Sequence, residues 1–509
     1  MSFLKIDSYK KGAITSLFFS GVAKGLAFFQ SVIIAFYFGT SFHTDVYFFV
    51  YTTITLIASY IISLNYLVLI PEAMKLSATV SDKEAQRFLN LFLYIFVFLV
   101  LLLEIIFFCN PIHFFGTFSK LDISILNSEK GTMIWFMPVL LLIVLSAYFT
   151  DILTSKKYFA LPLIVNSVNS LLTVISVFLL HQYFGVRCAI IGIYVGYFFN
   201  LVWLVYILLS RLKWDFWSVS FKLRRGVLRN ILYAYLSQVT TFLGSFFPIY
   251  LISSFSAGIM TSLSYAQRVG QIPEQLIISQ TSSVLGIKLN ELNVTKQTNQ
   301  LNRVLIEVAA STLFLIVPCS FLLFLYSDKI VEIIFMRGSF GMSSVHSTAL
   351  LLKFLGVSIP FVALNAFYSR VFIALQKMKL AFYSGLIVNI LFLLLLYVLV
   401  KFFGPIGYPI AITTYLAASV LVVFPLLFYF KMPIINSAAL LRCVLQIYLL
   451  NLLISFPVWL LIVNHYQPNI GFYILWVIAC LIIVNYYTKT SMHFYLFQKT
   501  ILSKLLFFR

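Results

Sequence analysis

Long apolar runs separated by short polar joints occupy most of the chain. The first series of runs lies at residues 13–38, 45–70, 88–109, 132–154, 158–181 and 187–210. A second series lies at residues 230–254, 258–286, 304–327, 344–375, 380–402 and 405–430, and a terminal pair at residues 443–464 and 469–487. Since about 20 residues cross a bilayer as a helix, the pattern predicts an all-α polytopic membrane protein with about 14 transmembrane helices.

The composition supports the same class. Of the 509 residues, 62% are hydrophobic and only 10% are charged, whereas a soluble domain carries about 25% charged residues. The apolar runs leave almost no room for an extramembrane catalytic domain. The five cysteines and six histidines lack disulfide or metal-site spacing, and no enzyme motif is present. We therefore predict no enzyme activity, no cofactor and no metal site.

The positions of the charged residues predict the orientation of the chain. Lysine and arginine number 35 against 15 acidic residues, which gives a formal net charge of +20. With the N-terminus inside, 25 of these cations fall in inside segments, 6 in outside segments and four within predicted spans. The positive-inside rule then predicts that both termini are cytoplasmic. Because the excess charge is accounted for as an orientation signal, nucleic acid is not a predicted partner.

The most basic joint, residues 211–229, separates two blocks of six helices. Two short sequence similarities relate the blocks. Phe38–Asp45 lies 217 positions before Phe255–Ser262, and Gly116 lies 222 positions before Gly338. Parallel repeats of this kind are typical of transporters that hold the substrate between their halves. The predicted domains are an N-terminal lobe at 1–210, a basic cytoplasmic linker at 211–229, a C-terminal lobe at 230–430, and terminal helices with a cytoplasmic tail at 431–509.

Three cations, Lys24, Arg268 and Lys353, lie near the middle of predicted spans. A charge at that depth costs at least about 2.5 kcal/mol, so each is expected to meet a cavity, an acid or a bound anion. Fewer acids lie equally deep, which favours a positive central cavity suited to a phosphate or diphosphate. The alternative is snorkelling, or pairing with an acid. The candidate acids are Asp45, Glu104, Glu274 and Glu307.

A polar stripe follows the eighth predicted helix. Its members, which are spaced by 4, 3 and 4 residues and so share one helix face, are Ser264, Arg268, Gln271 and Gln275. Pro273 is expected to open the backbone hydrogen-bond ladder nearby. We expect Arg268 to bind a diphosphate bidentately and Lys24 to act as a point charge. Asp45 and Glu274 are expected either to neutralise a cation or to carry a coupling proton.

Three motifs resemble the MviN/MurJ family of lipid II flippases, whose superfamily includes O-antigen flippases and multidrug exporters. They are Phe38-Gly39 with Thr44-Asp45, Tyr265-Ala266-Gln267-Arg268 with Pro273, and Phe335-Met336-Arg337-Gly338-Ser339-Phe340. The resemblance implies two V-shaped lobes, alternating access, and a lipid-tail groove beside the terminal helices. Where the family carries an arginine pair in the first helix, this chain has Lys24 and Gln30, and the arginines expected in the second helix are absent.

These features favour a flippase for a polyprenyl-diphosphate-linked saccharide, either lipid II or a surface-polysaccharide unit, in a bacterial cytoplasmic (inner) membrane. The predicted central-cavity residues are Lys24, Gln30, Ser264, Arg268, Gln271, Gln275 and Lys353. The expected partners are the lipid-linked glycan, membrane lipids and envelope-biosynthesis enzymes. Two alternatives stay open: a membrane-embedded glycan polymerase or ligase, and a cation-coupled multidrug antiporter on the same fold.

Overall fold

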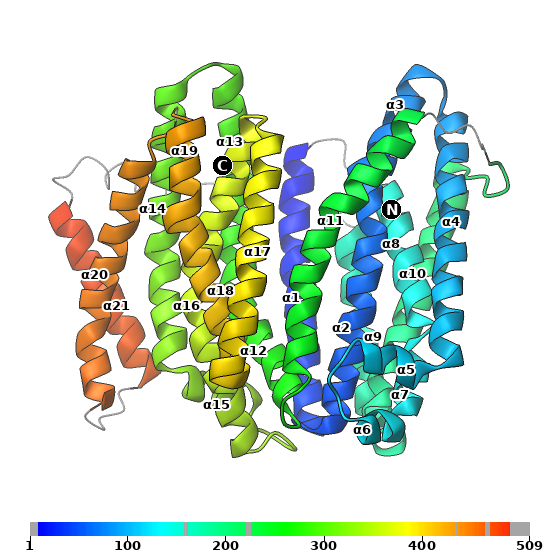
Figure 1. Ribbon diagram of the computed structural model, residues 1–509, viewed down its shortest axis with the longest axis horizontal. Coiled ribbons are helices and arrows are strands. Elements are labelled where there is room, and N and C mark those ends of the chain that lie inside the picture. Colours follow the sequence, from blue (N-terminus) through cyan, green and yellow to red (C-terminus); the bar gives the residue numbers. More distant parts are fainter. Residues whose placement is uncertain are drawn as a thin grey trace. The chain divides into compact units, whose positions relative to one another are not determined.

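The computed structural model describes residues 9–156, 158, 161–219, 225–433, 435–463 and 469–488 (Figure 1). Every regular element in these ranges is a helix, which confirms the all-α prediction. Packing divides the chain into two compact units. Unit 1 comprises Met1–Ser264 and Ile334–Val345, and unit 2 comprises Tyr265–Ile333 and His346–Arg509. The two predicted termini and part of the predicted linker, residues 220–224, lie outside the described residues.

Eleven segments of the described chain are long and apolar enough to cross a membrane, against the fourteen helices predicted. Three features account for the difference. Lys379–Lys431 is one 53-residue segment that contains two helical arms joined by a turn. The helix that begins at Ile259 carries too many polar residues to qualify, and Ile470–Cys480 is too short.

Unit 1 contains the elements from the N-terminus to the first part of α12. They are α1 (Tyr9–Phe38), α2 (Phe42–Leu64), the π-helical turn η2 (Asn65–Leu69), α3 (Ile70–Thr79), α4 (Asp82–Cys109), α5 (Pro111–Thr117), α6 (Ile123–Ser128), α7 (Lys130–Phe136), α8 (Val139–Ser155), α9 (Leu161–Phe184), α10 (Arg187–Leu212), α11 (Arg225–Ile252) and the start of α12 (Ile259–Pro273). α2, η2 and α3 form one continuous segment of 38 residues.

Local polar side chains set where the helices of unit 1 begin. Ser41 caps α2, since the backbone N–H of Ser41 donates to Thr44 Oγ1 at 2.8 Å and Ser41 Oγ accepts from Thr44 N at 3.4 Å. The predicted span at 132–154 is broken between α7 and α8 by a turn at Pro138, which has no N–H. Glu104 Oε1 accepts the exposed amide of Leu141 at 3.0 Å, which satisfies the start of α8 inside the membrane segment.

Small residues let α9 and α10 approach closely. A Cβ added at Gly192 would lie 2.4 Å from Thr173 Cα, and one added at Gly196 would lie 2.3 Å from Asn169 Oδ1. Such contacts hold membrane helices together because lipid gives them little hydrophobic driving force. In the same unit α11 packs on α2, where the rings of Tyr235 and Phe242 lie 5.4 and 5.3 Å from that of Tyr60.

Unit 2 contains the rest of α12 and the elements that follow, except for Ile334–Val345, the end of α15 and the start of α16, which belong to unit 1. They are the π-helical turn η3 (Glu274–Ile278), α13 (Ser279–Val294), α14 (Thr298–Leu325), α15 (Ser327–Phe335), α16 (Met342–Ala374), α17 (Met378–Phe403), the 3-10 turn η4 (Gly404–Ile406), α18 (Gly407–Ala418), the π-helical turn η5 (Ser419–Val423), α19 (Phe424–Lys431), α20 (Ser437–Val463) and α21 (Ile470–Thr488). The π-helical turn η3 directly follows Pro273 and confirms the predicted opening of the helical ladder.

The core of unit 2 joins α13, α14, α16, α19 and α20. Its centre is a group of buried aromatic rings, in which Tyr368 lies 5.2 Å from Phe424 and 5.1 Å from Phe428. The terminal helices α20 and α21 pack beside α14. Tyr473 of α21 is only 2% exposed and its hydroxyl donates to the carbonyl of Pro318 at 3.4 Å. The two terminal helices are therefore part of the packing of unit 2.

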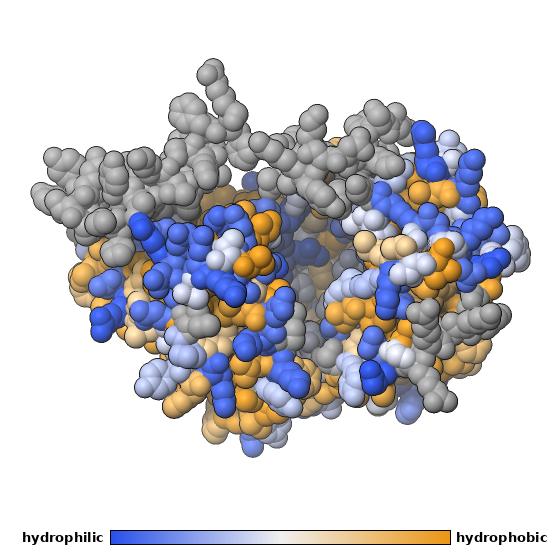
Figure 2. Space-filling view, turned by 90° about the horizontal axis from the view of Figure 1, so that it is seen from above, coloured by the Kyte–Doolittle hydropathy of each residue, from blue (hydrophilic) through white to orange (hydrophobic). Residues whose placement is uncertain are grey.

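The distribution of surface hydropathy fits a membrane-spanning fold. Figure 2 views the molecule from the end at which α3 and α13 lie in Figure 1, and hydrophilic side chains gather on this face of each unit. Hydrophobic side chains lie around the outer flanks. Large exposed apolar residues are frequent on α4, α10 and α17, where lipid is the expected solvent.

Candidate functional site

Arg268 is an exposed side chain of α12 and belongs to unit 2. Among the described residues it forms no hydrogen bond and no ion pair. In particular, Glu274 is not its ion-pair partner, and Glu307 is bound to Arg303 at 2.7 Å instead. An exposed arginine without a carboxylate partner has a planar fork of N–H donors that can bind an anion.

The other members of the polar stripe surround Arg268 along the helix. Gln271 and Gln275 lie on its face, and Gln275 Nε2 donates to Gln271 Oε1 at 3.3 Å. Ser264 Oγ instead donates to the carbonyl of Met260 at 3.0 Å, so its hydroxyl hydrogen is engaged by its own helix. Gln267, which belongs to the second family motif but not to the polar stripe, joins α12 to α18, since its Nε2 donates to Tyr408 Oη at 3.1 Å.

Lys353 lies within α16 and is partly buried in unit 2. Its ammonium group is 4.9 Å from the centroid of the Phe324 ring of α14, which is a cation–π distance. The ring therefore supplies one of the stabilising partners that a lysine at this depth needs. No spacing rule connects Phe324 to Lys353, so only the packed structure reveals the contact.

Lys24 and Gln30 lie on α1 in unit 1, and both side chains are partly buried. Lys24 is 14 residues from the end of α1 at Phe38, or about 21 Å along the axis. Gln30 follows by six residues, which turns it by about 120° around the helix relative to Lys24. The two positions at which the resembling family carries arginines therefore do not share one face of α1.

Asp45 is buried, with only 4% of its surface exposed, and it caps the start of α12. Its carboxylate accepts the N–H groups of Gly258 at 2.5 Å and Thr261 at 2.8 Å, and the Thr261 hydroxyl at 2.6 Å. A carboxylate at a helix N-terminus satisfies free backbone donors and complements the helix dipole. Asp45 thus has backbone and hydroxyl partners rather than a cationic one.

The first and third motifs of the sequence analysis meet in unit 1. Ser339 N donates to the carbonyl of Phe36 at 2.8 Å, and Thr40 Oγ1 lies 2.6 Å from Ser344 Oγ. Gly39 and Gly338 have φ values of +57° and +59°, and a Cβ at either would lie 2.3 Å from a carbonyl oxygen of the other segment. These glycines are required by close backbone approach and by left-handed conformation. The two motifs therefore build a junction of close backbone contacts in unit 1.

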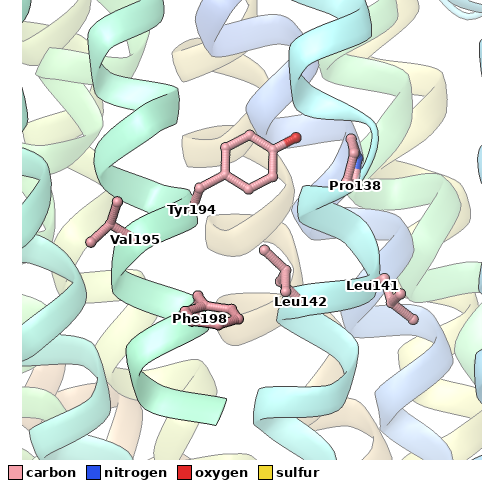
Figure 3. A pocket seen from close by; sticks show the side chains of 6 residues that line it. All are labelled: Pro138, Leu141, Leu142, Tyr194, Val195 and Phe198. Atoms are coloured by element: carbon pink, nitrogen blue, oxygen red, sulfur yellow. The ribbon is translucent and has the colours of Figure 1, made fainter. Parts of the chain in front are cut away.

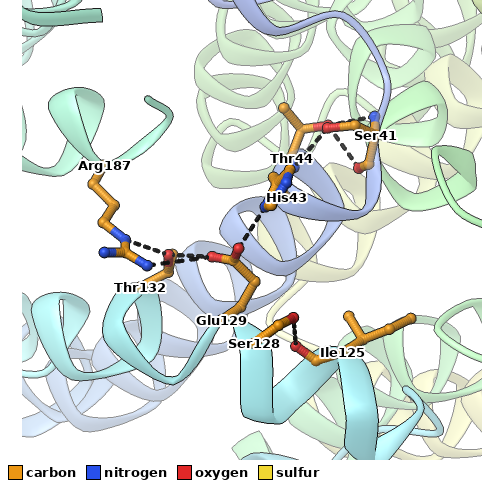
Figure 4. Close-up of polar contacts among 8 residues, drawn as sticks. All are labelled: Ser41, His43, Thr44, Ile125, Ser128, Glu129, Thr132 and Arg187. Atoms are coloured by element: carbon orange, nitrogen blue, oxygen red, sulfur yellow. Dashed lines mark hydrogen bonds and ion pairs between the residues drawn. The ribbon is translucent and has the colours of Figure 1, made fainter. Parts of the chain in front are cut away.

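A second polar network in unit 1 was not foreseen from the sequence (Figure 4). Glu129 is 4% exposed and is bonded to His43 Nδ1, while it accepts the Thr132 hydroxyl at 2.5 Å. Arg187 Nη2 lies 4.0 Å from the same carboxylate, and Arg187 Nε donates to Thr132 Oγ1 at 3.0 Å. The network joins α2, α7 and α10, whose contributing residues are up to 144 positions apart.

A pocket of about 450 Å³ lies between α8 and α10 (Figure 3). The residues that line it are Pro138, Leu141, Leu142, Tyr194, Val195 and Phe198. The Tyr194 hydroxyl already donates to the carbonyl of Trp135 at 2.5 Å. Because the remaining lining is apolar, this pocket has no group that would bind a diphosphate. No cluster of metal-ligating side chains occurs in the part of the chain that the structure describes.

Comparisons with known proteins agree with the fold and the motifs. The family model described as "Lipid II flippase MurJ" matches residues 34–480. A probable lipid II flippase MurJ from Borreliella burgdorferi is 25% identical over 392 residues, 74% of each chain. The corresponding protein from Bdellovibrio bacteriovorus is 23% identical over 249 residues, 47% of each chain.

Solved structures show the same fold at low sequence identity. A lipid II flippase MurJ in an inward closed conformation superposes with a TM-score of 0.76 at 21% identity, covering 97% of this chain and 99% of the other. An inward-facing multidrug resistance transporter of the MATE family superposes with a TM-score of 0.62 at 16% identity, covering 84% and 96%. The fold is thus shared with transporters of different cargo.

Proposed function

Because the chain belongs to the MurJ family of lipid II flippases, we propose that it moves lipid II, a lipid-linked glycan, across the bacterial cytoplasmic membrane. Transport by this family requires no bond to be made or broken in the cargo. The proposal therefore includes alternating access of the binding site and no catalytic residue. Envelope-biosynthesis enzymes that make or consume the lipid-linked glycan are proposed partners.

Arg268 carries the proposal. It is exposed on α12, it belongs to the polar stripe of that helix, and none of the described acids forms an ion pair with it. A guanidinium group binds a phosphate with two parallel hydrogen bonds, each about twice as strong as a neutral one. We propose that Arg268 binds the diphosphate of the cargo and that Gln271 and Gln275 bind neighbouring polar groups.

The remaining predicted cavity residues have supporting roles in the proposal. Lys24 supplies a movable positive charge from α1, and Gln30 supplies a neutral donor where the resembling family has an arginine. Lys353, whose ammonium group makes a cation–π contact with the Phe324 ring, adds positive potential to unit 2. Glu274, at the start of the π-helical turn, is the proposed site of a coupling proton, since π turns often mark functional positions.

The test is lipid II translocation by the purified full chain in liposomes. Arg268→Ala should lower the flipping rate at least about tenfold, because a hydrogen bond to a charged group contributes about 1.5–3 kcal/mol. Arg268→Lys should recover part of the rate, since lysine keeps the charge and loses the fork. Lys288→Ala is the matched control, because it removes a cation of α13 that is already paired with Glu291 at 2.9 Å.

A double variant separates anion binding from charge balance. If Arg268 served to neutralise Glu274, removing one partner would leave a buried charge and removing both would restore function. The proposal predicts that Arg268→Ala combined with Glu274→Gln flips no better than Arg268→Ala alone at normal abundance. Near-normal flipping by the double variant would rule out the diphosphate-binding role.

The multidrug antiporter alternative makes an opposite prediction. A site for cationic drugs needs acids that are free of backbone partners, yet Asp45 and Glu104 both accept backbone amides. Expression of the chain in a drug-sensitive strain should therefore leave the inhibitory concentration of cationic dyes unchanged within about twofold. A resistance that depends on Glu274 would favour the antiporter instead.

A further inference from the structure

Arg370 is the fourth cation within the predicted spans, and the sequence analysis assigned it no role. It lies on α16 four residues before Ala374, which is about 6 Å from the end of that helix. Its Nε donates to Ser282 Oγ of α13 at 3.1 Å. Gly286 leaves room for the side chain, since a Cβ there would lie 3.0 Å from Arg370 Cδ.

The two terminal nitrogens of Arg370 have no hydrogen-bond partner among the described residues, and none of the described acids forms an ion pair with it. Ser282 is neutral and 4% exposed, so it positions the guanidinium without neutralising it. A charge in a membrane segment that lacks an ionic partner is expected to serve a bound anion or to line a water-filled path. The free side of the guanidinium is the side that binds phosphate bidentately.

A row of polar side chains, which we call the polar track, runs along the same helical segment from the proposed binding site at Arg268 to Ser283, the residue after Ser282. Four residues spaced by four, Gln271, Gln275, Ser279 and Ser283, follow α12, η3 and α13. Ser279 Oγ donates to the Gln275 carbonyl at 2.6 Å and Ser283 Oγ to the Ser279 carbonyl at 2.8 Å. Ser282, which holds Arg370, lies 14 residues beyond Arg268, or about 21 Å along the helix. The two arginines are therefore too far apart to bind one diphosphate together.

An equivalent contact in unit 1 is made without a positive charge. There Asn65 Nδ2 of η2 donates to Asp151 Oδ2 of α8 at 3.1 Å. Ser282 follows Asn65 by 217 positions and Arg370 follows Asp151 by 219, close to the repeat offset seen in the sequence. The same pair of helix positions thus carries an acid in unit 1 and a base in unit 2. Both pairs join their two helices by a polar contact, and only the pair in unit 2 carries a positive charge.

We propose that Arg370, positioned by Ser282, is a second diphosphate-binding residue of the transport path. It binds the diphosphate of the lipid-linked cargo at the end of unit 2 that is predicted to be cytoplasmic, before the cargo reaches Arg268. The inference rests on the proposed function. It assigns the cargo two successive positions along the polar track of unit 2.

The test uses farnesyl diphosphate as a soluble probe and the full chain in phosphatidylcholine nanodiscs. Arg370→Gln should weaken probe binding about tenfold, and Arg370→Lys should recover part of it. Ser282→Ala should weaken binding about threefold, because the arginine loses its positioning contact. Asn65→Ala, the matched change in unit 1, should leave binding unchanged within about twofold.

Several results would overturn the inference. One is equal loss of binding in Arg370→Gln and Arg370→Lys together with a lower unfolding temperature, which would indicate a structural role. Another is full competition by phosphatidylglycerol nanodiscs, which would indicate a general contact with anionic lipid. If Arg370→Gln binds the probe and flips lipid II normally while Arg268→Ala does not, the inference fails and the proposed function stands. If the unchanged chain flips no lipid II, the proposed function itself fails.

Discussion

The charged side chains of this protein are of two kinds. Some accept hydrogen bonds from backbone amides, and others keep donors that no described residue accepts. Asp45 and Glu104 lie in membrane segments, yet both carboxylates accept backbone amides at helix starts. Arg268 and Arg370 are the opposite case, since neither has an ionic partner among the described residues. A buried charge whose hydrogen bonds are satisfied stabilises the fold, and one with free donors is available to a ligand. This difference separates structural charges from candidate functional ones.

Asp45 provides a test at this scale. Asp45→Ala should lower stability by about 2–4 kcal/mol, because three donors of the α12 start lose their acceptor in a buried position. Asp45→Asn should lower stability less than Asp45→Ala does, since one side-chain oxygen remains to accept a hydrogen bond. The measurement is thermal unfolding of the purified chain in detergent, beside lipid II flipping. Normal stability with abolished flipping in Asp45→Asn would point to a coupling proton at Asp45 instead.

At the scale of elements, the polar helix of unit 2 differs from its neighbours. α12, η3 and α13 form one continuous helical segment. Because of its polar residues, this segment is not among the eleven that are apolar enough to cross a membrane. Pro273 cannot donate to the helical ladder, and the π turn that follows rotates the next residues around the axis. The composition of this element suits a helix that lines a water-accessible path, because a helix surrounded by lipid is apolar on its outer face.

The terminal helices give a prediction for whole elements. A chain that ends after Phe430 should insert into the membrane but should not flip lipid II. The reason is that α20 and α21 cover the apolar faces of Tyr326 and α14 from outside, as the burial of Val458 and Tyr473 shows. Membrane fractionation and the liposome assay measure the two outcomes. Full transport by the truncated chain would remove any role of these helices in holding the cargo.

At the scale of the whole molecule, two units of similar design differ in charge. The contact between η2 and α8 in unit 1 recurs between α13 and α16 in unit 2, which supports the predicted parallel repeat. The equivalent residues are Asp151 in one unit and Arg370 in the other. Repeats conserve helix positions because packing constrains them, while exposed or cavity-lining side chains are free to diverge. The anion-binding function is accordingly proposed for arginines of unit 2.

The orientation of the whole chain is tested by reporter fusions. Fusions at Asn127 and Gly258 should report an outside location, and fusions at Val219 and Asn293 an inside location. The expectation follows from the division of cations between the two sides, 25 inside and 6 outside. Alkaline phosphatase and green fluorescent protein activities measure the two locations. An outside signal at Val219 would contradict the predicted topology, since this position lies in the most basic joint.

The sequence by itself determined the class of fold, the positions of the helices and the polar face of α12. These features depend on local composition and on spacing within one helix, and both can be read along the chain. The predicted opening of the backbone hydrogen-bond ladder near Pro273 was confirmed for the same reason, since it depends on neighbouring residues only. The family motifs could likewise be found in sequence, although their physical role could not.

Only the tertiary structure decided what the buried polar groups do. Asp45 meets Thr261 across 216 positions, His43 meets Glu129 across 86, and Arg370 meets Ser282 across 88. No local spacing rule records such pairs, because they form where helices distant in sequence pack side by side. The structure therefore shows that Asp45 caps the start of α12, while its coupling role stays a prediction, and it shows that Arg370 is held by Ser282. In both cases the donors and acceptors that the packed helices satisfy define what the charged group does in the fold.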